Sequence, residues 1–250
     1  RKLSNGDANA DALNVIANGG TKEEAVIAAA NVVQSRGGSL QQIANAAANA
    51  MFAAGGTALE AKQAAYEAVI RAGGTVQQAR TFSENAVNAA IRSQTQTLTD
   101  NAKNAADEVI KSGGTKEEAV AAAVSAVKTG GGSPTVCGEA AYNAVLAAGG
   151  TTDEAEKERL KAIADATYEE VIKNGGSKDE AVVDAAAAAA KDAYDRVIKN
   201  GGTPQEALEE ASKVAADIIT ANGGTPTQAA NAIKKVLQDN GVSTDKIAEG

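Results

Sequence analysis

The sequence predicts an all-α protein, an α-solenoid-like tandem-repeat array of about twelve short antiparallel helices. Three observations predict this fold. A Gly-Gly pair followed by Thr or Ser occurs ten times in the 250 residues, most often at a spacing of 18. Alanine, the strongest helix former, accounts for 59 residues. All three prolines, Pro134, Pro204 and Pro226, directly follow such a loop, where the first position of a helix needs no N–H.

Each repeat carries marks for both ends of one helix. The hydroxyl residue after Gly-Gly suits the N-cap, because its oxygen can accept from the free N–H groups of the first turn. Glu or Gln follows three residues later in nine copies, which completes a capping box; Ser133 and the degenerate last copy at Ser243 lack it. The first Gly of each pair suits the left-handed conformation that ends a helix. The predicted structural caps are Thr21, Ser39, Thr57, Thr75, Thr115, Ser133, Thr151, Ser177, Thr203 and Thr225.

These marks place the helices in order along the chain. One degenerate repeat junction lies near 93–98, where polar, β-favouring residues replace the Gly-Gly loop; we interpret it as a break between two helices, with a single long helix as the alternative. A thirteenth helix is expected to begin near Thr244. The predicted helices are 8–17, 22–35, 40–53, 58–71, 76–92, 98–111, 116–129, 134–147, 152–173, 178–199, 204–221 and 226–239.

The loops also predict how the helices pack. Links of two or three residues force each helix to fold back against the one before it. We therefore expect residues 1–250 to form a single continuous array, and a segment of a longer repeat protein because the pattern reaches both ends. Most helices have only a narrow polar strip, which indicates burial on several sides. The lengthened helices at about 152–199 offer the best candidate for a special contact surface.

All four tyrosines occupy the same slot, seven residues before the first Gly of a pair. Each is followed by an aliphatic pair at three and four residues, on the same helix face. We interpret the slot as a bulky core filler whose hydroxyl reaches the rim; the alternative is a ladder of stacking platforms for bases or sugars. The predicted packing slot consists of Tyr66, Tyr142, Tyr168 and Tyr194.

The composition argues against most catalytic and binding chemistry. The chain has no His and one Cys, which excludes Cys/His zinc sites and His-dependent catalytic sets. Cys137 occupies a slot that holds Ala or Ile in the other copies, so we interpret it as a small core residue. The Gly-Gly-Thr loops lack the Lys of a phosphate-binding loop. We expect no catalytic residues, no cofactor, no metal site and no enzymatic activity.

The net charge and the hydropathy of the chain limit the classes of partner that we expect it to bind. A net charge of −8 disfavours nucleic acid, and no apolar run is long enough for membrane insertion. The loop in Val15–Gly20 resembles that of transcription-activator-like effectors, which read DNA one base per repeat. Those repeats are about twice as long and line a basic superhelix, whereas this chain is acidic. The wider sequence also resembles designed helical toroids.

These observations predict a structural repeat protein, an Ala-rich helical solenoid segment that serves as a spacer, fibre or filament subunit. Its expected partners are copies of itself or neighbouring repeats of the same chain. The alternative is a solenoid binding module for a protein or peptide partner. That alternative predicts exposed residues that depart from the repeat and gather on one face.

Overall fold

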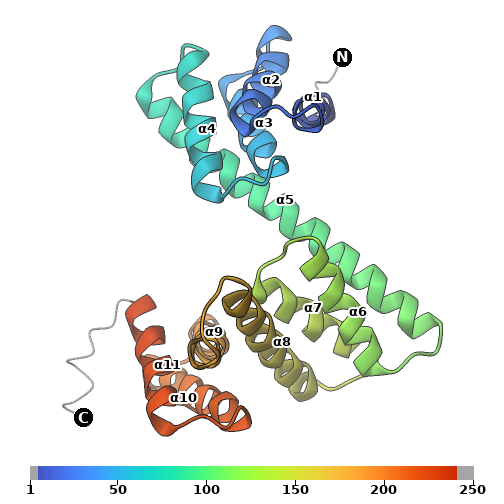
Figure 1. Cartoon of the computed structure of the whole chain (residues 1–250), viewed down its shortest axis with the longest axis vertical. Helices are drawn as coiled ribbons and strands as arrows, with labels where there is room; N and C mark the ends of the chain where they lie inside the picture. The colour runs from blue at the N-terminus through green and yellow to red at the C-terminus, as the bar shows by residue number, and fades with distance from the viewer. Residues whose placement is uncertain (1–4, 241–250) are drawn as a thin grey trace. The chain divides into compact units, whose positions relative to one another are not determined.

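The chain is an array of α-helices joined by short loops (Figure 1), as the sequence predicts. A computed structural model describes residues 5–240, and side chains from residue 8 onwards. Eleven helices and no strand occur in this part of the chain; the thirteenth helix predicted near Thr244 lies outside it. The helices are α1 Asn5–Ala17, α2 Lys22–Ser35, α3 Leu40–Ala53, α4 Ala58–Arg71, α5 Val76–Lys111, α6 Lys116–Thr129, α7 Pro134–Ala147, α8 Thr152–Lys173, α9 Lys178–Lys199, α10 Pro204–Ala221 and α11 Pro226–Asp239.

The chain divides into two compact units. The N-terminal unit, Arg1–Gln96, contains α1 to α4 and the first part of α5. The C-terminal unit, Thr97–Gly250, contains the rest of α5 and α6 to α11. Each unit has its own buried core, and the C-terminal unit has two clusters. The repeats are therefore continuous in sequence but are grouped into two packed bodies.

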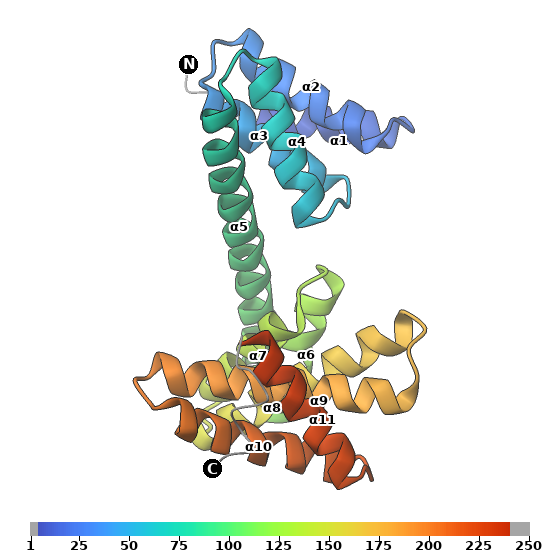
Figure 2. The same cartoon turned by 90° about the vertical axis from the view of Figure 1, so that its left-hand side faces the viewer.

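The preferred interpretation of residues 93–98 as a break between two helices is wrong. α5 runs from Val76 to Lys111 as one helix of 36 residues, visible as an uninterrupted coil in Figure 2. Ser and Thr lower helix propensity by only about 0.5 kcal/mol each. A turn at this junction would also need the left-handed residue that glycine supplies elsewhere. Every described residue with positive φ is the first Gly of a pair, and none lies between Gly73 and Gly113.

The loops explain why both glycines of a pair are needed. In the loop after α2, Gly37 has φ of +74° and donates its N–H to Gln34, while the N–H of Gly38 reaches back to the carbonyl of Val33 at 2.9 Å. These two bonds form a Schellman motif, which satisfies the last carbonyls of the helix. A Cβ on Gly38 would lie 2.3 Å from Val33 Cγ1. The first Gly thus supplies the conformation and the second supplies the space.

Burial differs among helices that look equally apolar in the sequence. α3 packs against α1, α2 and α4, and α9 packs against α8, α10 and α11. α9 accordingly buries eight residues, six of them Ala between 185 and 193 and one of them Tyr194. α6 buries a single stripe, Ala119, Ala123 and Val127. The prediction of burial on several sides therefore holds for α3 and α9 and fails for α6. In the described part of the chain, no helix is both long and apolar enough to cross a lipid bilayer.

Candidate functional site

The hydroxyl residues that begin the repeats all lie at helix N-termini. In the first of them, Thr21 Oγ1 accepts from the N–H of Glu24 at 3.1 Å, and Glu24 Oε2 accepts from the N–H of Thr21 at 2.8 Å. Ser133 and Ser177 accept from the third helical residue but form no complete box. Eight of the nine predicted capping boxes are complete, at Thr21, Ser39, Thr57, Thr75, Thr115, Thr151, Thr203 and Thr225.

The capping boxes hold carboxylates in a defined and ionised state. The N–H of Thr57 donates to Glu60 and lowers the pKa of this carboxyl below its ordinary value. The N–H of Thr151 has the same effect on the pKa of Glu154, with Lys116 as a further cause. Because a hydrogen bond to the charged form favours that form, these two boxes each present a negative charge at the start of a helix.

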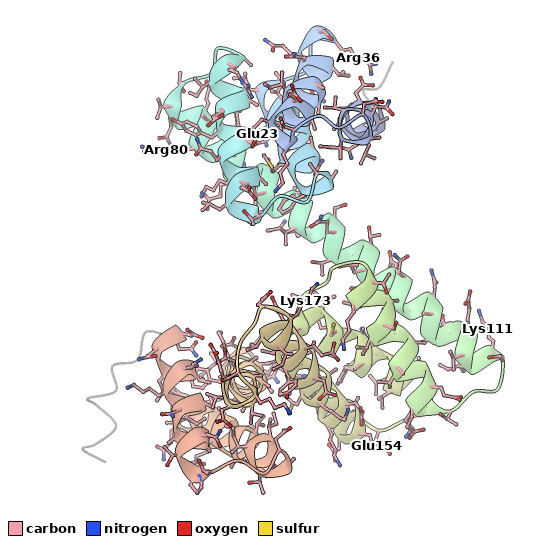
Figure 3. All side chains as sticks on the ribbon, in the orientation of Figure 1. Glu23, Arg36, Arg80, Lys111, Glu154 and Lys173 are labelled. Carbon is pink, nitrogen blue, oxygen red and sulfur yellow. The ribbon has the colours of Figure 1, made fainter. Side chains whose placement is uncertain are left out.

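Two of these carboxylates also link a helix to the next helix but one. Lys22 is the first residue of α2, and its Nζ lies 3.6 Å from Glu60 Oε1 in the capping box of α4. Lys116 is the first residue of α6, and its Nζ lies 3.0 Å from Glu154 Oε2 in the capping box of α8 (Glu154 is labelled in Figure 3). We call this interaction the rung. It recurs once in each unit, from the same two positions of the repeat.

α9 and α11 are also alternate helices. Their N-terminal turns are joined by an amide and a carboxylate and not by Lys and Glu. The capping-box residue of α11 is Gln228, and its Nε2 lies 3.4 Å from Asp179 Oδ1 at the second position of α9. One further polar contact joins the two helices among the described residues, an ion pair between Lys235 and Asp184. The contact between alternate helices is therefore a repeated property of the fold, and its chemistry varies from one pair to the next.

Between the helices joined by a rung lie open grooves. The α2–α4 groove has a volume of about 470 Å³ and the α6–α8 groove one of about 520 Å³. The α2–α4 groove contains Leu59, 78% exposed, and Ile27, 40% exposed. The α6–α8 groove is instead crossed by an ion pair between Lys128 and Glu169 at 2.8 Å. The two grooves share a position in the repeat but present different surfaces.

The lengthened helices α8 and α9 are held together by part-buried ion pairs where α8 begins and α9 ends. The guanidinium of Arg159 on α8 binds both carboxylate oxygens of Asp192 on α9 at 2.8 Å. This hydrogen bonding is the main reason that the pKa of Arg159 is raised. Arg196 on α9 pairs with Glu156 on α8 and lies 5.6 Å from the ring centroid of Tyr142 on α7. The polar network thereby ties α7, α8 and α9 together.

The tyrosine slot lies at the edge of the cores. Tyr194 is buried, with 8% exposure, and belongs to the cluster around α9. Tyr66 and Tyr168 are half-buried and pack against cores of the N-terminal and C-terminal units respectively. Tyr142 is half-buried beneath Arg196. Tyr66, Tyr168 and Tyr194 thus have apolar neighbours, and Tyr142 contacts the guanidinium of Arg196.

The other candidates for reactive or ligand-binding groups are Cys137, clusters of metal ligands and the Gly-Gly-Thr loops. Cys137 is fully buried in α7, and burial raises the pKa of its thiol. Among the described residues, no three potential metal ligands of the His, Cys, Asp or Glu type lie together. In the loop after α1, the N–H groups of Gly19 and Gly20 donate to helix carbonyls, and the N–H of Thr21 donates to Glu24. Such loops therefore have few donors left for a phosphate group.

The predictions made from the sequence include neither the rung nor the two exposed apolar residues of the α2–α4 groove, Ile27 and Leu59. A signal for the rung exists, because Lys directly follows the cap in α2, α6 and α9. Leu59 also stands out once the repeats are aligned on their caps, because polar residues hold that slot elsewhere. The alignment alone does not show that α2 and α4 bring Ile27 and Leu59 into one groove.

Comparison of the chain with protein-family models, with curated proteins and with solved structures found no match in any of the three. The likeness to transcription-activator-like effectors is thus confined to the loop. The function has to be argued from the geometry of the chain itself.

Proposed function

We propose that the chain is a structural repeat protein, a helical scaffold segment that serves as a spacer or as the subunit of a fibre or other assembly. The rung carries the proposal. It uses the first and third residues of a helix, which are Lys and Glu together in both α2 and α6. A repeat with both residues can donate to one neighbour and accept from another, so the contact can be propagated along an array.

The packing supports the same role. The cores consist mainly of Ala with Val and Ile, which lets helices approach closely without large side chains. The capping boxes use the N–H groups of the cap and of the third helical residue, and the Schellman motifs use carbonyls of the last turn. The proposal assigns the chain no catalytic role, since the described carboxylates are engaged in caps and ion pairs or lie singly on the surface.

Light scattering over a wide range of protein concentration, combined with electron microscopy, tests the proposal. An assembly subunit should give oligomers or ordered fibres that grow with concentration. A chain that stays monomeric at high concentration would contradict the assembly role and leave the spacer role, which X-ray scattering then tests by its requirement for a constant end-to-end length. A broad distribution of lengths would contradict the spacer role as well.

A second candidate function is a binding module for a peptide or protein. The observation in its favour is the α2–α4 groove, where two exposed apolar residues that depart from the repeat lie together. Clustered departures of this kind are what the binding role requires of a repeat array, because a regular scaffold has no need of them.

A further inference from the structure

The α2–α4 groove combines an apolar surface with an acidic rim. Its floor includes Val26, Met51 and Ala64, and the exposed side chains of Ile27 and Leu59 stand at its edges. A leucine with 78% of its surface exposed contributes little to the stability of its own unit. Its side chain is instead available to a partner, and the groove beside it can receive apolar side chains.

The other repeats show that the fold does not require Leu59. This residue is the second of its helix, a position that is polar in every other copy. Leucine therefore departs from the repeat at a position where polar side chains serve the fold equally well. The residues in this slot elsewhere are Glu23, Gln41, Gln77, Glu117, Thr135, Asp153, Asp179, Gln205 and Thr227.

Ile27 departs from the repeat less sharply, because its slot is polar in most but not all of the other copies. It lies six residues after its cap, a slot that is apolar elsewhere only at Ala121 and Val183. Two independent departures have therefore arisen on different helices, and the packing of α2 with α4 places both in one groove. The polar residues in this slot are Asn45, Gln63, Thr81, Glu139, Lys157, Glu209 and Asn231.

The charges at the groove favour a basic occupant. Three carboxylates line it, Glu23, Glu60 and Glu67, against the single cation Arg71 (Glu23 is labelled in Figure 3). Glu60 is paired with Lys22. Neither Glu23 nor Glu67 has an ion-pair partner within residues 8–240, which leaves two carboxylates beside the apolar floor.

The α6–α8 groove provides the contrast within the same chain. Two of its four carboxylates, Glu117 and Glu158, have no ion pair among the described residues, whereas Asp165 and Glu169 are paired with Lys161 and Lys128 respectively. The latter two charges are satisfied internally, and no large apolar residue along that groove is as exposed as Leu59. Both grooves therefore have acidic groups without an ion pair among the described residues, and the α2–α4 groove differs in its exposed aliphatic side chains.

We propose that the α2–α4 groove binds a helical segment of a partner protein, with aliphatic residues that pack on Leu59 and Ile27 and Lys or Arg residues that pair with Glu23 and Glu67. An amphipathic helix in a groove between two helices is a recurrent mode of peptide recognition. α2 has 14 residues, so the groove accommodates a helix of about four turns. A second copy of this chain fits less well, because its net charge is −8.

This inference deepens the binding role and does not depend on self-assembly. The probe is a displayed library of random peptides selected on the whole chain, followed by synthesis of the enriched peptides for affinity measurement. We expect enriched peptides to contain paired aliphatic residues flanked by Lys or Arg. Their affinity should fall roughly tenfold or more in Leu59→Glu, which introduces the residue that α2 and α6 carry in that slot.

Matched variants distinguish binding in the groove from nonspecific binding to exposed apolar residues. Leu13→Glu removes another exposed leucine, on α1 and outside the groove, and should leave the affinity unchanged. Ile27→Asn should weaken binding less than Leu59→Glu because Ile27 is less exposed. All three sites are at the surface, so the melting temperature should stay close to that of the parent chain.

Three outcomes would overturn the proposal. One is a selection that yields no peptide whose binding depends on Leu59. Another is enrichment of peptides without basic residues, with affinities that do not change with salt. The third is a dimer, seen by light scattering, that Leu59→Glu dissociates, because a second copy would then be the occupant. A monomeric chain that binds basic peptides would support the proposal that the α2–α4 groove binds a partner helix. That result would contradict only the assembly role.

Discussion

The helix pairs α2–α4 and α6–α8 are built on the same frame and differ in what they expose. Both have a Gly-Gly loop, a capping box and a rung from the first residue of one helix to the third residue of the next but one. The first pair leaves Leu59 open to solvent beside unpaired carboxylates. The groove of the second pair has no apolar residue as exposed as Leu59 and is crossed by the ion pair between Lys128 and Glu169. The repeat thus fixes the helix ends and leaves the groove free to vary.

The two pairs also differ in helix length and in the ion pairs that their helices form. α4 has 14 residues, whereas α8 has 22. The longer helix is held at its start by Lys116 on one side and by Arg196 on the other. Ion pairs join short helices too, as in the rung between α2 and α4, and the long hairpin of α8 and α9 adds two less exposed ion pairs.

Removal of one partner from the buried pair on α8 and α9 should have the largest effect. Arg159→Met leaves Asp192 charged and nearly buried, since the two side chains are 13% and 10% exposed. We expect the free energy of unfolding to fall by about 3 kcal/mol, measured by urea denaturation. The double variant Arg159→Met/Asp192→Leu should lose less. A loss no larger than that of Lys62→Met, which breaks an exposed pair with Glu84, would contradict this view.

Filling the space at the second Gly of a loop should cost nearly as much, and should do so in both units. A Cβ on Gly38 would lie 2.8 Å from the carbonyl oxygen of Val33, and one on Gly132 would lie 2.3 Å from Val127 Cγ1. We expect Gly38→Ala and Gly132→Ala each to destabilise the chain by about 2 kcal/mol. Gly37→Ala, which meets no atom within 4 Å but has positive φ, should cost about 1 kcal/mol. Unequal losses in the two loops would show that the frame is not shared.

A glycine in the middle of α5 distinguishes a continuous helix from a repeat junction. Gln94 is exposed within the helix, so Gln94→Gly should lower the free energy of unfolding by about 1 kcal/mol. Gln94→Ala should be neutral or slightly stabilising, because Ala is the better helix former. Thermal unfolding followed by circular dichroism measures both. A neutral glycine would favour a loop at this position.

Breaking the rung should have the smallest effect and the clearest dependence on pH. Glu60→Gln and Glu154→Gln keep an oxygen for the capping box but lose the ion pair with Lys. The pKa of each carboxyl is below its ordinary value of 4.5. The stability that each ionised carboxyl contributes is therefore present above pH 4.5 and is lost as the pH falls through the lower pKa of the folded state.

The melting temperature at neutral and acidic pH measures this effect. We expect both variants to melt slightly below the parent at neutral pH, and the gap to close in acid and in high salt. Glu118→Gln provides a control, because Glu118 completes a capping box but forms no ion pair within the described residues. An equal change in the control would mean that the box, and not the rung, is responsible.

Most of the helix boundaries could be predicted because they depend on local chemistry. Nine of the eleven described helices begin and end where the Gly-Gly loops and caps place them, for example α8 at Thr152–Lys173. The exceptions are α1, which begins three residues earlier than predicted, and α5, where two predicted helices are one. At residues 93–98 the polar side chains predict a break, yet the absence of glycine is the stronger signal.

The candidate site could be predicted only in part. The position of Leu59 after its cap is visible in the printed repeats, but the neighbour that shares its groove is not. The partner of Lys116 lies 38 residues away in Glu154, and no local pattern gives that distance. Likewise, the bond between Arg159 and Asp192 depends on the register of two long helices.

The sequence by itself determined the helices, their caps and their antiparallel succession, because each of these depends on hydrogen bonds and backbone conformations within a few residues. Tertiary structure alone decided the division into two units, the deep burial of α3 and α9, and which carboxylates meet a cation. These properties depend on contacts between alternate helices. Alanine-rich faces permit many such contacts with similar energy, so only the folded arrangement selects among them.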